Sequence, residues 1–187
     1  MRKIPKLLLL LIIFGFILLL VGYLHALFFR VNVVFYSAIF DAIIASGLTT
    51  LLFLLKPFNL FQNFEKILVV FVFILLGYSY AISVPTVIDR SLSFYILEKL
   101  QQRGGELPYA DFDNVFKEEY MIEHHLVDVR LTEQVESGTV EINDNIVVLT
   151  KWGDRLASFS RFYRKNLLPK KRLLMGTYSD VLTDPFK

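Results

Sequence analysis

Cysteine is absent from all 187 residues of the sequence. Its absence excludes disulfide bonds and metal sites built on thiolates. The sequence also lacks the glycine-rich phosphate loop, the serine nucleophile elbow and the Rossmann glycine run that mark several large enzyme classes. Apolar side chains are abundant instead, since hydrophobic residues make up 55% of the chain. That share is too high for an ordinary soluble domain of this length.

Three long segments are almost free of charge. Leu7–Phe29 and Ile67–Ile88 contain no Asp, Glu, Lys or Arg, and Val33–Leu55 contains only Asp41. A helix needs about 20 apolar residues to cross a bilayer, and only a helix satisfies its own backbone hydrogen bonds there. No small-residue cleavage site follows the first segment, so we expect it to be retained rather than removed as a signal peptide. The sequence predicts a three-helix transmembrane anchor over residues 1–88.

Asp41 is the one charged residue within these segments, and a carboxylate inside a membrane helix faces protein or water. Small and hydroxylated residues accompany it, and such residues allow helices to pack closely. We therefore predict an intramembrane packing seam, with a proton or ion pathway as the alternative. His25 is predicted to be an interface residue near the end of its helix. The seam consists of Ser37, Asp41, Ser46, Gly47 and Thr50.

Charge divides the rest of the chain into an acidic and a basic block. Residues 89–150 carry five Lys or Arg against thirteen Asp or Glu, whereas residues 151–187 carry nine against three. Beside the predicted spans, five Lys or Arg lie on the amino-terminal side and four on the other, which does not decide the orientation. The basic block favours a cytoplasmic soluble domain, because anionic lipid is richest on that leaflet.

Local signals predict a soluble domain over residues 89–168. Ser91 can cap a helix that ends at Gly104, and further helices are expected over residues 109–120 and 122–135. Alternating residues around Asn143-Asp-Asn145 predict a β-hairpin. Thr150 can then cap a last helix, which Pro169 ends. Residues 169–187 are expected to form a basic, irregular tail.

This order of helices and hairpin resembles a winged-helix domain. The resemblance is carried by Gly138-Thr-Val-Glu-Ile and by Val148-Leu-Thr-Lys-Trp-Gly153, which is similar to the L-T-x-x-G that ends the wing in many regulators. It implies a fold that is mainly α, with three transmembrane helices followed by a small α+β winged-helix-like domain. It also implies DNA binding as a function to test.

The charge of the third soluble helix argues against DNA. A DNA reader neutralises phosphates with Lys and Arg, whereas this helix carries mainly acids, which would repel phosphate. We therefore predict that it docks a protein partner through Glu123, Asp128, Arg130 and Glu133.

The last helix combines bases with aromatic residues, as helices on a membrane surface do. The alternative is a solvated helix that closes the core of the domain. The predicted membrane-surface residues are Arg155, Phe159, Arg161, Phe162, Arg164 and Lys165.

No active site is expected. His124 and Asp128 share a helical face but lack a third metal ligand at a fitting spacing, so we predict neither a metal nor a cofactor. The start at Asp89-Arg-Ser-Leu-Ser, together with the wing, resembles small bacterial membrane proteins associated with envelope glycan assembly. That resemblance implies a bacterial inner membrane location and a partner such as a membrane glycosyltransferase.

These observations predict a non-catalytic accessory subunit that contacts the lipid bilayer and another membrane protein or membrane-associated enzyme. Two alternatives stay open, a membrane-tethered winged-helix transcription regulator and a small transporter or channel subunit. The sequence does not specify the oligomeric state.

Overall fold

The computed structural model describes residues 3–185 and divides the chain into two compact units, Met1–Tyr120 and Met121–Lys187. The first unit contains the apolar helices α1 (Lys3–Phe28), α2 (Val34–Thr50) and α3 (Asn63–Ser83). The 3-10 turn η1 (Leu51–Leu54) prolongs α2, and α4 (Pro85–Arg90) follows α3. By length and composition, Lys3–Phe28, Val34–Leu54 and Asn63–Arg90 can each cross a membrane. The prediction of three membrane-length helices is confirmed.

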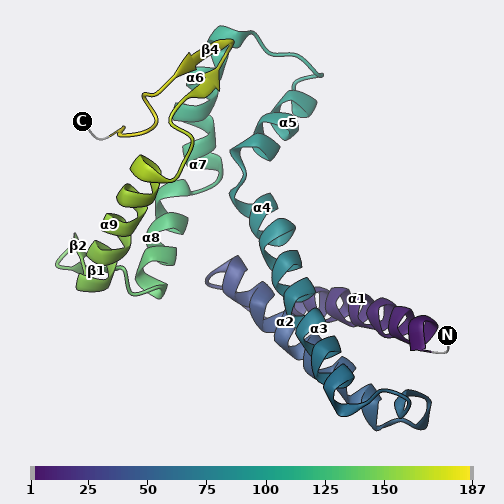
Figure 1. Ribbon diagram of the computed structural model, residues 1–187. Helices are drawn as coiled ribbons and strands as arrows, with labels where there is room; N and C mark the ends of the chain where they lie inside the picture. Colours follow the sequence, from purple (N-terminus) through teal and green to yellow (C-terminus); the bar gives the residue numbers. More distant parts are fainter. Residues whose placement is uncertain (1–2, 186–187) are drawn as a thin grey trace. The chain divides into compact units, whose positions relative to one another are not determined.

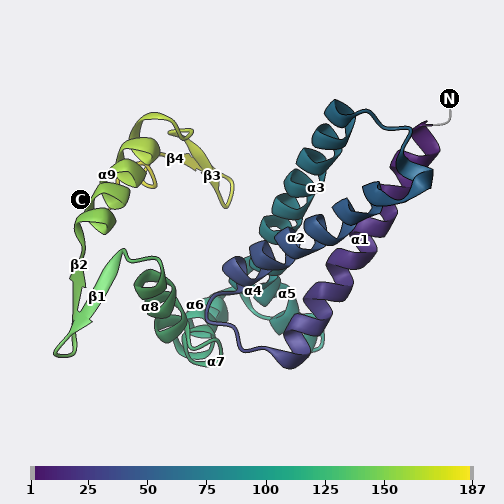
Figure 2. The same cartoon turned by 90° about the horizontal axis from the view of Figure 1, so that it is seen from below.

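The connection between α2 and α3 lies beside the start of α1 (Figure 2). Lys3 Nζ is 2.6 Å from Glu65 Oε1, and Lys6 Nζ donates a hydrogen bond to the carbonyl oxygen of Pro57. Glu65 also caps its own helix by accepting a hydrogen bond from the backbone N–H of Gln62. These contacts hold one end of all three helices together.

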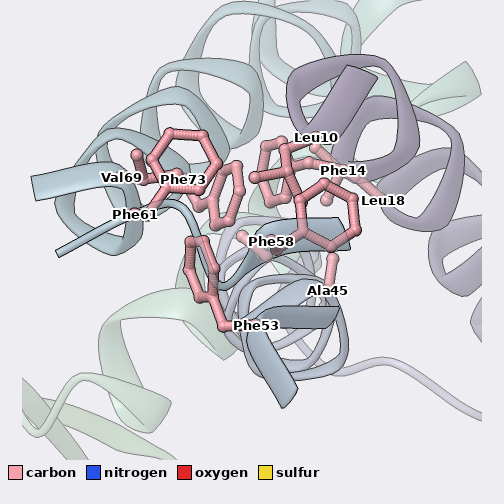
Figure 3. Packing of buried hydrophobic residues seen from close by; sticks show 10 residues of the cluster. Leu10, Phe14, Leu18, Ala45, Phe53, Phe58, Phe61, Val69 and Phe73 are labelled. Carbon is pink, nitrogen blue, oxygen red and sulfur yellow. The ribbon is translucent and has the colours of Figure 1, made fainter. Parts of the chain in front are cut away.

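The core of the first unit lies between α1, α2 and α3 and is rich in phenylalanine (Figure 3). The rings of Phe14 and Phe73 stack with their centroids 4.9 Å apart. Phe58 and Phe61, from the connection after η1, are buried in the same cluster, while Phe64 stays exposed. The connection therefore folds back onto the bundle and completes its core.

A bend at Val84 separates α3 from α4 (Figure 1). Pro85 has no N–H to donate and its ring clashes with the preceding turn, so a continuous helix cannot pass through it without distortion. Ser91 then caps α5 (Leu92–Gln102), its Oγ accepting a hydrogen bond from the backbone N–H of Phe94. Gly104 and Gly105 adopt positive φ and end this helix, as predicted.

Residues 109–120 form short helical turns in place of the predicted continuous helix. They are η3 (Tyr109–Asp111), α6 (Phe112–Asn114) and the wide π-helical turn η4 (Val115–Tyr120). A Lys99 ion pair holds this segment against α5, with Nζ 2.8 Å from Glu119 Oε2. Arg103 Nη2 lies 2.5 Å from the other oxygen of the same carboxylate, Oε1. Tertiary contacts with α5 thus stabilise a segment with little regular helix of its own.

The second unit begins with α7 (Met121–Glu123) and α8 (Leu126–Glu136). The predicted helix over 122–135 is interrupted because His125 has a left-handed backbone with φ of 43°. Strands β1 (Val140–Asn143) and β2 (Ile146–Leu149) pair antiparallel, with Val140 opposite Leu149. Asp144 and Asn145 form the turn with positive φ, which confirms the predicted hairpin.

Helix α9 (Lys151–Asn166) follows the hairpin, and Thr150 caps it as predicted by accepting a hydrogen bond from the Gly153 N–H. The prediction of an irregular tail is wrong for part of that segment. Strands β3 (Arg172–Leu174) and β4 (Thr177–Ser179) form a second antiparallel hairpin, turning at Met175 and Gly176 with positive φ.

A winged-helix fold is not confirmed. Its first helix and residues 109–120 belong to the other unit. Within residues 121–185, no hydrophobic side chain is buried. Val129 on α8 and Leu156 and Phe159 on α9 are exposed, so these apolar side chains do not pack into a core within this unit. What is shown is a mainly helical chain with three membrane-length helices and small two-stranded hairpins.

Candidate functional site

The most unusual polar group in the three-helix bundle is an ion pair between α1 and α2. His25 Nδ1 lies 2.6 Å from Asp41 Oδ1, and Ser37 Oγ lies 3.3 Å from the same ring nitrogen. The Asp41 side chain is 9% exposed and that of His25 is 17% exposed. The contact between Nδ1 and Oδ1 gives each side chain a hydrogen-bond partner inside the bundle, which offsets the cost of burying the two polar groups.

His25 was expected at the interface, and its role as the partner of Asp41 was not predicted. One signal does point to it, because only five residues join α1 to α2, so polar side chains within about two turns of these helix ends lie near the same end of the hairpin. Gly22 also faces the pair, since a Cβ placed there would lie 3.7 Å from Asp41 Oδ2.

Two small cavities flank this pair. One has a volume of about 250 Å³ and is lined by Ser37, Tyr80 and Pro85 as well as by the pair itself. The other has a volume of about 180 Å³ and is lined by apolar residues such as Phe29 and Phe40. The rings of Phe29 and Phe40 stand edge-on to the His25 ring, at centroid distances of 5.3 and 6.3 Å. The pair therefore has a polar side and an apolar side.

The other hydroxyl groups of the predicted seam bond within their own helix. Ser46 Oγ donates to the Ala42 carbonyl and Thr50 Oγ1 donates to the Ser46 carbonyl, both at 2.7 Å. Such back-bonding satisfies the hydroxyl without linking two helices. Gly47 does not belong to the packed seam, because it is exposed and a Cβ there would meet no atom within 4 Å.

The close approach of α2 and α3 occurs at Gly77 instead. A Cβ on Gly77 would lie 2.7 Å from the Cβ of Ala42, closer than real Cβ contacts. Together with the buried residues Ala38, Ala45 and Ala81, these positions form the small-residue interface of the bundle.

In the second unit, the L-T-x-x-G segment has a structural explanation. The Thr150 hydroxyl donates to the Gly138 carbonyl at 2.8 Å while accepting from the Gly153 N–H at 3.0 Å. A Cβ on Gly153 would lie 2.0 Å from the Thr139 carbonyl oxygen, so only glycine fits. This motif joins the hairpin to α9 and carries no ligand-binding chemistry of its own.

Helix α9 presents a continuous apolar stripe beside its bases. Trp152, Leu156, Phe159 and Tyr163 recur at spacings of three and four residues, and each is exposed. Such spacing places them on one face of a helix. Of the predicted membrane-surface residues, Phe159 belongs to this stripe and Phe162 lies at its edge, while the bases lie on the flanks or the opposite side. All six are exposed or half-buried: Arg155, Phe159, Arg161, Phe162, Arg164 and Lys165.

The predicted docking residues lie on α7 and α8 and divide into two groups. Glu133 is buried and its Oε2 lies 2.6 Å from Arg130 Nη1, so these two stabilise the helix itself. Asp128 is 82% exposed and lies 3.8 Å from His125 Nδ1. Glu123 is exposed at the end of α7. Glu123 and Asp128 therefore remain candidates for contact with a partner.

Among residues 3–185, no three His, Cys, Asp or Glu side chains come together as a metal site would require. No family model matches the chain, and neither a curated protein nor a solved structure matches it. Function therefore has to be argued from the chemistry of the chain alone.

Proposed function

We propose that this chain is a non-catalytic accessory subunit of a membrane assembly. Helices α1 to α3 anchor it in the bilayer, and the unit over residues 121–187 docks a partner protein. The observation that carries the proposal is that residues 121–185 bury no hydrophobic side chain. A unit of this size normally stabilises itself by burying apolar surface, and large exposed apolar patches mark interaction sites.

This unit has two exposed apolar surfaces, one on the β1–β2 hairpin and one on α9. The β1–β2 hairpin exposes Ile142, Ile146, Val148 and Leu149, with Ile146 64% exposed. The stripe on α9 is flanked by bases, a composition that suits the headgroup region of a membrane. We assign the hairpin to the protein partner and α9 to the membrane surface, with Glu123 and Asp128 as further acidic contacts for the partner.

We base the identity of the partner on the resemblance of the Asp89-Arg-Ser-Leu-Ser start and the wing to small bacterial membrane proteins associated with envelope glycan assembly. On this basis, the partner is a membrane enzyme of envelope polysaccharide synthesis, such as a glycosyltransferase, and the membrane is the bacterial inner membrane. The His25–Asp41 pair then holds α1 and α2 together within the anchor.

We place the second unit on the cytoplasmic side, where anionic lipid would attract the bases of α9. The lysines at the Lys3 end of the bundle favour the opposite orientation, because Lys and Arg beside membrane helices are more frequent on the cytoplasmic side. Because the chain has no native cysteine, a single Lys171→Cys substitution provides a unique label site. Cytoplasmic placement predicts labelling by a membrane-impermeant maleimide only after cells are permeabilised, and labelling of intact cells contradicts it.

Partner docking is tested by purifying the full chain from its host in mild detergent. We expect the wild type to retain a stoichiometric membrane enzyme and Val148→Ser to lose it, because that substitution replaces one of the exposed apolar side chains of the hairpin with a polar one. Val181→Ser is the matched control, since Val181 is exposed in the same unit but lies outside the hairpin. Recovery of the chain alone, or equal retention by both variants, contradicts the proposal.

A further inference from the structure

The first unit contains a groove that neither the polar pair nor the docking surfaces explain. It has a volume of about 470 Å³ and lies between the end of α2, the turn η1 and the first half of α3. The lining from the α2 side includes Thr50, Leu51 and Leu54. The size falls within the range of ordinary ligand pockets, and the lining is almost entirely apolar.

The groove follows the axis of α3. Lys66, Val70 and Ile74 line it at four-residue intervals, which places them along one face of the helix. Eight residues of α-helix rise about 12 Å. The groove therefore starts at the end of the bundle where Lys3 meets Glu65 and runs about 12 Å towards the middle of α3.

Lys66 supplies the only charge in the lining of this groove. Its Nζ lies 5.9 Å from the centroid of the Phe53 ring, which also lines the groove. The neighbouring carboxylate of Glu65 is already engaged by Lys3 and by the Gln62 N–H. Within residues 3–185, no carboxylate forms an ion pair with Lys66.

An apolar channel that begins at a cation and runs along a membrane helix matches the shape and charge of an anionic lipid. We propose that this groove binds one anionic phospholipid, with an acyl chain along α3 and the phosphate beside Lys66. Basic pockets between membrane helices select anionic headgroups through this arrangement. The inference rests on the bilayer placement of α1 to α3 in the proposed function, and it requires neither partner docking nor a particular orientation of the chain in the membrane.

The test measures lipid binding to the full-length chain in a neutral detergent by native mass spectrometry. Phosphatidylglycerol and phosphatidylcholine with identical acyl chains are the two probes. We expect the wild type to bind phosphatidylglycerol about fivefold more tightly, as one base near an anionic headgroup provides. Lys66→Gln removes this preference, whereas Arg30→Gln, which removes one positive charge in the connection between α1 and α2, keeps it.

A second variant tests the acyl channel independently of the charge. Ile74 is half-exposed at the deep end of the groove, so Ile74→Trp fills the space while facing lipid. We expect it to weaken binding of both lipids and to leave their ratio unchanged. Equal binding of the two lipids to the wild type overturns the proposal, as does a preference that survives Lys66→Gln. Co-purification of a partner is measured in a separate experiment, so the lipid site and partner docking can each be refuted without the other.

Discussion

Replacing His25 and replacing Asp41 should lower the free energy of unfolding by different amounts, because a different polar group is left without its partner in each case. The 2.6 Å contact is largely shielded by the bundle, so the remaining partner is left without its hydrogen bond in an apolar site. Leaving a buried charge without its partner costs about 3–5 kcal/mol, whereas leaving a neutral polar group without its hydrogen bond costs about 1–3 kcal/mol. His25→Phe, which strands the carboxylate, should therefore be the more harmful change.

We expect His25→Phe to lower the free energy of unfolding by about 3–4 kcal/mol, because it leaves a carboxylate without its partner in an apolar site. Asp41→Leu should lower it by about 1–2 kcal/mol, the size of a lost interhelical hydrogen bond in a membrane. The double variant leaves neither group without a partner. Its decrease in the free energy of unfolding should therefore be at least about 2 kcal/mol smaller than the sum of the decreases in the two single variants.

The assay is reversible unfolding in mixed micelles, titrated with a denaturing detergent and followed by circular dichroism. Ser37→Ala serves as the local control and should change stability by less than about 1 kcal/mol, because its contact with His25 is 3.3 Å long. If the two single losses add within about 0.5 kcal/mol, the residues are not coupled and the reasoning is refuted. An equal cost for both single variants would refute the argument about charge.

Two further predictions concern packing and pH. Gly77→Ala should destabilise the bundle by about 1–3 kcal/mol in the same micelle assay, because its Cβ would press on Ala42, whereas Gly15→Ala should be neutral or stabilising since nothing lies within 4 Å. Outside the bundle, hydrogen bonding from Lys99, helped by Arg103, lowers the pKa of Glu119. Its interaction with Lys99 and Arg103 therefore stabilises the fold at pH values above the ordinary pKa of glutamate. This stabilisation is lost as the pH falls through the lowered pKa of Glu119. An NMR titration should show a depressed midpoint for Glu119 that Lys99→Met raises, and an unshifted midpoint in the wild type would contradict the assignment.

Local features of this chain were readable from the sequence, because they depend on neighbouring residues. The three nearly uncharged runs specify helices long enough for a membrane, since their length and apolarity are properties of each run alone. The Ser91 and Thr150 caps, the stop at Gly104 and the turn at Asp144 and Asn145 depend on a few adjacent residues. Each of these predictions is confirmed.

Contacts between distant elements were decided only in the tertiary structure. His25 became the partner of Asp41 because two helices meet at that depth, and Gly77 rather than Gly47 became the packing glycine because α3 faces Ala42 there. The left-handed break at His125 and the β3–β4 hairpin also had no strong local signal. The sequence of α9 left two possibilities open, a helix on a membrane surface and a helix that closes the core of the domain, because which surface its apolar residues contact depends on long-range packing. Residues 121–185 leave these side chains exposed, so α9 closes no core in this unit and is a candidate interaction surface.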